Sequence, residues 1–263
     1  MWLVLFGLSA LPAQAQQPAP VISIIIDDLG NHWRSAERSL ALPGQVTLAI
    51  LPHTPYSVRL ATRAHASGRE IMLHLPMASI HQHRPGPGAV NVAMDEKEFD
   101  DIVAANLEAV PYISGVNNHM GSQVTPSTRH MDWLMTRLER RGNLYFVDSR
   151  TTASSVAAVL SQEKGLPTLK RDIFLDHRRD RASIHKQFQR LLRLSEQRGW
   201  AVAIGHPYPE TLAMLEAELP KLAARGIELV PVSRLIREHR EQGPVLWQAS
   251  LSPLQQDSKN SKQ

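Results

Sequence analysis

The sequence contains no cysteine among its 263 residues. This absence excludes thiolate catalysis and disulfide bonds, and it leaves the redox compartment undetermined. No predicted strand is followed by a glycine-rich phosphate-binding fingerprint, which disfavours a dinucleotide or nucleotide fold. Aromatic residues make up only 5% of the chain, and the arginine-rich segments 137–141 and 178–181 carry none between their charges. We therefore expect no nucleic-acid partner.

What the chain does have is a hydrophobic content of 43% and a mixed charge with a formal net of +4. This composition is typical of a packed globular protein. The one long apolar run, residues 2–11, is too short for a permanent membrane span and is followed by a small-x-small site ending at Ala15. We predict a signal peptide over residues 1–15, although no Lys or Arg precedes the apolar run, and a mature N-terminal segment over residues 16–20. Cleavage near Ala15 would make the protein periplasmic or secreted.

Residues 21–28 form a β-branched run that ends in two adjacent carboxylates, and they predict a fully buried strand. Short apolar strands then alternate with helices. The strands are expected at 21–28, 46–51, 70–75, 113–118, 144–148, 169–175, 200–205 and 227–230. The helices are expected at 31–42, 55–67, 95–110, 126–141, 151–164, 184–198, 210–225 and 232–239.

This alternation predicts an α/β fold, a distorted (β/α) barrel of about seven or eight parallel strands. The barrel would span residues 21–240 and exist as a monomer, and residues 241–263 lose periodicity and are expected to be a disordered polar tail. A doubly wound open sheet is the alternative fold, and it lacks the glycine-rich fingerprint that would support it.

Polar residues gather where the predicted strands end. They are Asp27, Asp28, His53, His74, His119, Asp148, Asp176, His177 and His206. In a β/α barrel these ends converge on one face, where active sites are built. A carboxylate with two imidazoles is typical of a catalytic zinc site with a position open for water. Each residue alone has an ordinary structural reading, as a turn former, a helix cap or a satisfied core histidine.

Five motifs in order resemble the divergent polysaccharide deacetylase family, which is related to NodB-like carbohydrate esterases. They are residues 25–28 (IIDD), 74–77 (HLPM), 117–122 (NNHMGS), 146–149 (FVDS) and 204–207 (IGHP). The resemblance implies a NodB-like barrel and a metal-dependent hydrolase that removes acetyl groups from a polysaccharide or oligosaccharide.

The resemblance also implies roles for three of the site residues. Asp27 would be the catalytic base, Asp28 a metal ligand and His206 the catalytic acid. The family's histidine after the third strand maps to His74, which we assign as a metal ligand. We assign His119 as the second metal imidazole by its chemistry. Asp148 would orient the site or bind substrate. The cofactor would be a divalent metal, Zn²⁺ by this ligand set.

The chain departs from the related enzymes at the position four residues after His74, where Ala78 replaces their second histidine. Either His119 fills that ligand position, or His81 and His83 fold back from the loop 76–92, or these two stay exposed. A non-catalytic glycan-binding or envelope scaffold protein with the same barrel is therefore the alternative function. Phosphoester hydrolysis is a third hypothesis, disfavoured by a shortage of Arg and Lys at the predicted strand ends. Trp33, Tyr56, Trp133 and Tyr208 are candidates for sugar stacking or for core packing.

Overall fold

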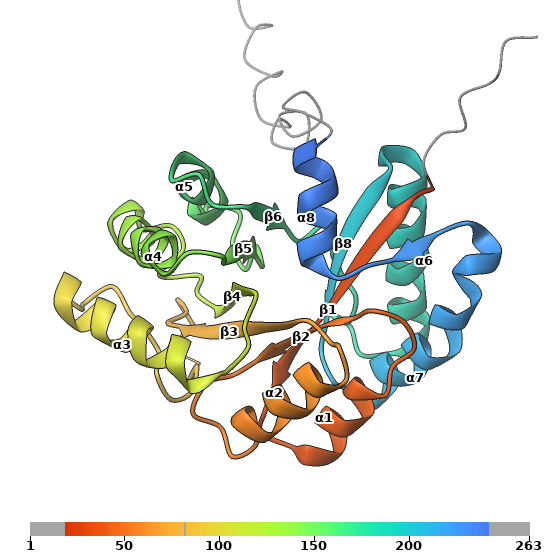
Figure 1. The fold of residues 1–263 in the computed structure, drawn as a ribbon, viewed down its shortest axis with the longest axis horizontal. Helices are drawn as coiled ribbons and strands as arrows, with labels where there is room; N and C mark the ends of the chain where they lie inside the picture. Colours follow the sequence, from red (N-terminus) through yellow and green to blue (C-terminus); the bar gives the residue numbers. More distant parts are fainter. Residues whose placement is uncertain (1–18, 82, 242–263) are drawn as a thin grey trace, which may run out of the picture.

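The computed structural model describes residues 19–81 and 83–241, in which parallel strands form one curled sheet surrounded by helices (Figure 1). The strand order is β6-β5-β4-β3-β2-β1-β8-β7, and β9 pairs with the start of β1. The predicted signal peptide lies outside the described residues, as do residues 16–18 and 242–263. The predicted α/β fold with a parallel, barrel-like sheet is confirmed, and the sheet is open between β6 and β7.

The strands are β1 (Val21–Leu29), β2 (Thr47–Ile50), β3 (Ile71–Met77), β4 (Gly115–Met120), β5 (Tyr145–Asp148), β6 (Thr168–Lys170), β7 (Ile173–Phe174), β8 (Trp200–Gly205) and β9 (Glu228–Leu229). The helices are α1 (Trp33–Leu40), α2 (Ser57–Ala66), α3 (Glu96–Ala109), α4 (Thr128–Arg141), α5 (Ala157–Glu163), α6 (Arg181–Arg198), α7 (Pro209–Glu218) and α8 (Val232–Glu241). No helix in residues 19–81 and 83–241 is both long and apolar enough to cross a membrane.

Alternate residues of each strand serve two separate hydrophobic layers. In β1, Ile22, Ile24 and Ile26 pack toward the outer helices, whereas Ile25 faces the inside of the curled sheet. Both faces of the strand are thus buried, which is why its sequence is largely apolar and does not alternate strictly between apolar and polar residues. On the inward side, Ser23 is buried with its hydroxyl donating to Val230 O, and Asp27 follows Ile25 at the carboxyl end.

Helix α8 closes the inside of the sheet at the amino ends of the strands. Its residues Leu235 and Ile236 pack on the inner apolar cluster. Glu70 fixes the start of this helix, because its carboxylate accepts hydrogen bonds from the Thr47 hydroxyl at 2.8 Å, the Tyr145 hydroxyl at 3.0 Å and the Ser233 amide at 3.1 Å. The amino end is therefore sealed, and the carboxyl end is left for function.

The prediction of one strand over residues 169–175 is wrong, because the segment contributes to two strands at opposite edges of the sheet. The structure divides it into β6, which pairs with β5, and β7, which pairs with β8 at the opposite edge of the sheet. Arg171 and Asp172 carry the chain across the opening between these edges. Two helices are also shorter than expected: α5 begins at Ala157, and α7 ends at Glu218 ahead of 3₁₀ turns that include Pro220, which lacks the amide hydrogen of a helix interior.

Candidate metal centre and active site

A β-bulge at the end of β1 aims two consecutive carboxylates at the same place. Adjacent residues of a regular strand point to opposite faces. The pairing with β2 advances three residues on β1, from Ile26 to Leu29, for two on β2, so β1 holds one extra residue. That residue allows Asp28, with a left-handed φ of 57°, to join Asp27 on the inner side. Gly30 then turns the chain with φ 120°, where a Cβ would lie 2.2 Å from the Thr54 hydroxyl.

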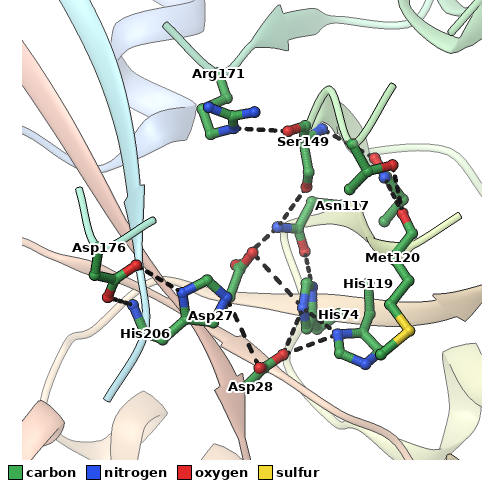
Figure 2. A network of polar contacts seen from close by, with 12 residues as sticks. Asp27, Asp28, His74, Asn117, His119, Met120, Ser149, Arg171, Asp176 and His206 are labelled. Carbon is green, nitrogen blue, oxygen red and sulfur yellow. Dashed lines mark hydrogen bonds and ion pairs between the residues drawn. The ribbon is translucent and has the colours of Figure 1, made fainter. Parts of the chain in front are cut away.

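Three side chains from β1, β3 and β4 converge on one point (Figure 2). Asp28 Oδ1 lies 3.1 Å from His74 Nε2 and 2.9 Å from His119 Nδ1, and the two ring nitrogens are 3.1 Å apart. These atoms form a nearly equilateral triangle. Bonds of about 2.0–2.2 Å in a tetrahedral zinc site place ligand atoms roughly 3.4 Å apart, so the set fits a divalent cation after a small expansion.

Asn117 fixes the tautomer of one of these ligands. Its Nδ2 donates to Asp27 Oδ1 at 2.8 Å, because a carboxylate can only accept. Its Oδ1 therefore faces His74 Nδ1, also at 2.8 Å, and accepts the hydrogen that this nitrogen must carry. His74 Nε2 is then the ring nitrogen that faces Asp28 and His119: without a metal it donates to Asp28, and on losing that hydrogen it would offer its lone pair to a cation.

The two aspartates have opposite electrostatic surroundings. Burial raises the pKa of Asp27, and the charges of His74 and His206 offset this effect only in part. Burial also acts to raise the pKa of Asp28, but hydrogen bonds from His119 and His74 outweigh it and lower that pKa well below its usual range. When the pKa values of two neighbouring carboxyl groups are shifted in opposite directions, one group typically stays ionised and the other exchanges protons.

His206 stands across the cluster on the loop after β8. Asp176 holds it, accepting from His206 Nδ1 at 2.9 Å and from the His206 backbone amide at 2.6 Å. Its Nε2 lies 3.8 Å from Asp28 Oδ2. Burial acts to lower the pKa of His206, but Asp176, Asp28 and Asp27 together raise it to about 9. The imidazole is thus held as a protonated group facing the carboxylates.

A pocket of about 250 Å³ opens beside Asp28 and His119. Its other wall is the loop between β3 and α3, where Arg84 and Pro85 line it. The loop 76–92 therefore borders the site. The Asp28 side chain is 32% exposed, so a cation at the triangle would be reachable from this pocket.

The comparisons with known proteins place this site in a family. A sequence profile described as divergent polysaccharide deacetylase matches residues 24–236. The uncharacterized protein YibQ of Escherichia coli K12 is 37% identical over 217 residues, which cover 82% of this chain and 67% of the relative. The chain belongs to the divergent polysaccharide deacetylase family.

Two solved structures share the fold of this family member. An uncharacterized protein from Agrobacterium tumefaciens has a TM-score of 0.80 at 23% identity, over 85% of this chain and 92% of that chain. The peptidoglycan deacetylase PdaC from Bacillus subtilis has a TM-score of 0.51 at 15% identity, over 85% of this chain and 94% of that chain. The NodB-like resemblance predicted from the motifs is confirmed at the level of family and fold.

Some residues that the sequence singled out do not join this deacetylase-like cluster. Asp148 is turned toward its own loop, where its carboxylate accepts from the Arg150 amide and the Ser155 hydroxyl. His53 contacts Asn106 of α3 at 2.9 Å. His81 and His83 lie exposed on the loop, so of the alternatives left open by Ala78 the structure brings only His119 to the candidate ligands.

Sequence reasoning missed three residues that shape the site: Asn117, Asp176 as the partner of His206, and Arg171 near Ser149. The signal for Asn117 was available, since it precedes His119 by two residues and so shares its face of β4. No sequence pattern pairs Asp176 with His206, because the contact joins segments 30 residues apart.

Proposed function

We propose that this protein is an exported, zinc-dependent hydrolase that removes acetyl groups from a saccharide. The observation that carries the proposal is the triangle of Asp28, His74 and His119 with an acid–base pair, Asp27 and His206, beside it. Membership of the deacetylase family supports a carbohydrate substrate. Export rests on the leader-like residues 1–15 and on nothing in the described part of the chain.

The protein's own groups supply the proton transfers. Asp27, 3.6 Å from His74 Nε2 and with a pKa raised by burial, is suited to accept the proton of the attacking water. His206, held protonated by Asp176, is suited to give a proton to the departing nitrogen or oxygen as its bond to the acetyl carbon breaks. Zinc held by Asp28, His74 and His119 would polarise the acetyl carbonyl and make water acidic enough to react near neutral pH.

The test is metal content together with acetate release from acetylated chitin and peptidoglycan fragments. We expect about one zinc per chain, and activity that a chelator abolishes and zinc restores. His119→Ala should lose both metal and activity. His83→Ala is the matched control, because this exposed loop histidine lies outside the triangle, and it should keep both. A wild-type protein that binds zinc but releases no acetate would contradict the enzymatic role.

A second function, glycan binding without turnover, is favoured by one observation: Ala78 stands where related enzymes carry a second histidine. A pseudoenzyme of carbohydrate esterase family CE4 from Bacillus anthracis shares this fold at a TM-score of 0.52. Glycan binding that survives replacement of both Asp27 and His206 by Ala, with no acetate released by the wild type, would support this role over catalysis.

A further inference from the structure

Arg171 is held rigidly at the rim of the site by backbone carbonyl groups. Its Nε donates to Ser149 O at 2.7 Å, and its Nη2 donates to Arg150 O at 2.9 Å. These two bonds use the side-on edge of the guanidinium. The end-on edge, formed by Nη1 and the second hydrogen of Nη2, has no partner among the described residues.

This cation lacks an acidic counter-ion. No carboxylate of residues 19–81 or 83–241 forms an ion pair with Arg171, although the side chain is half-buried. Asp172 next to it pairs with Arg198, and Asp148 accepts from Arg150 N and Ser155 Oγ. Burial and the nearby charge of Arg150 lower the pKa of Arg171, and the charges of Asp27, Asp148 and Asp172 offset this effect only in part. A partly buried cation that no carboxylate contacts directly is costly, and an anionic ligand would relieve that cost.

Arg171 is connected to Asn117 through Ser149 (Figure 2) and to His206 through Phe174. Through Ser149 it reaches Asn117, whose Nδ2 lies 3.3 Å from the Ser149 hydroxyl. Its guanidinium carbon lies 4.9 Å from the centre of the Phe174 ring, which packs edge-on against His206 at 5.3 Å. The guanidinium therefore lies beside residues that contact the proposed active site and not on a remote surface.

We propose that Arg171 binds a carboxylate of the saccharide, so that the preferred substrate is an acidic acetylated glycan. This inference rests on the proposed function for the reaction itself. The end-on edge of a guanidinium offers two parallel N–H groups that match the two oxygens of a planar carboxylate. Because the backbone carbonyls already fix the guanidinium, little conformational entropy is lost when the ligand binds.

The experiment compares a hyaluronan hexasaccharide, which alternates N-acetylglucosamine with glucuronate, with the same oligosaccharide after its carboxyl groups are reduced to alcohols. Metal-loaded full-length protein is used. The preference is measured as the ratio of kcat/KM where acetate is released, and as the ratio of Kd where none is. We expect the wild type to prefer the acidic form by about tenfold or more, mainly through KM.

Arg171→Gln should bring this preference close to one by weakening only the acidic ligand. Arg171→Lys, which keeps the charge but loses the fork, should retain a small part of it. Arg69→Gln is the matched control. Arg69 is also partly buried and bonded to backbone carbonyls, of Leu40 and Leu42, but it lies two residues before the start of β3, at the closed end of the sheet. This control should keep the full preference.

Three results would overturn the assignment. The wild type could show no preference for the acidic form. Arg171→Gln could weaken the binding of the acidic and the reduced oligosaccharide equally, which would mean that Arg171 only holds Ser149 and Asn117 in place. A phosphorylated chitin oligomer could be preferred over the hyaluronan hexasaccharide, which would assign the fork to phosphate. Failure of the proposed function looks different: no acetate is released from any glycan, while the Kd ratio still depends on Arg171.

Discussion

Replacement of Asn117 by leucine tests whether the hydrogen bonds of this residue orient His74 for metal binding. Asn117 is fully buried and joins Asp27 to His74 through two hydrogen bonds of 2.8 Å. Leucine has a similar volume but neither donates nor accepts. Asp27 Oδ1 would lose its donor from Asn117, and the Nδ1 hydrogen of His74 would lose its acceptor.

The expected magnitudes follow from these losses. Loss of a hydrogen bond that orients a ligand imidazole typically weakens metal binding about 10- to 100-fold. Two buried polar groups that lose these partners, at roughly 1–3 kcal/mol each, predict a loss of about 2–6 kcal/mol in the unfolding free energy of the metal-free protein. Zinc affinity is measured by competition with a chromophoric chelator, and the His74 tautomer by ¹⁵N NMR of the imidazole.

Asn106→Leu is the control for this experiment. Asn106 is equally buried and also bonds to a histidine ring and a carbonyl group, those of His53 and Gly88, but it lies outside the cluster. It should lose stability without losing zinc affinity. The reasoning is refuted if Asn117→Leu binds zinc as tightly as the wild type while His74 keeps its hydrogen on Nδ1.

Three further predictions follow from the same contacts. Activity that needs protonated His206 is present below its pKa of about 9 and lost as pH rises through that value, so Asp176→Asn should move the alkaline limb of the kcat/KM profile to lower pH; an unmoved limb would exclude His206 as the acid. Glu70→Gln should lower the unfolding free energy in urea by about 1–3 kcal/mol and leave zinc content unchanged, because the network of this carboxylate closes the opposite end of the sheet. Asp148→Asn should leave the zinc content and KM unchanged, because the Asp148 carboxylate faces its own loop. A lower zinc content or a higher KM would show that Asp148 takes part in the site.

The fold was predictable because the central strands are buried on both faces, so that each of them appears in the sequence as a short apolar run. The convergence of acids and histidines was predictable for a related reason. Parallel strands end at one edge, so a polar residue after several such runs marks a common place. Asp28, His74 and His119 could therefore be grouped without coordinates.

The finer geometry depended on contacts that the local sequence does not encode. The bulge that turns Asp28 toward Asp27 comes from the pairing of β1 with β2. Arg171 was hidden inside a predicted strand, because only the opening of the sheet divides residues 169–175. The sequence also did not show that the Asp148 carboxylate faces its own loop, because an aspartate at a strand end serves a turn as readily as a site.

The most direct test of the account is a crystal structure of the zinc-loaded protein with anomalous scattering measured at the zinc edge. The account predicts a single strong peak bonded to Asp28 Oδ1, His74 Nε2 and His119 Nδ1 at about 2.0–2.2 Å. A peak held by His81 or His83 instead, or no peak at this triangle in zinc-saturated protein, would contradict it.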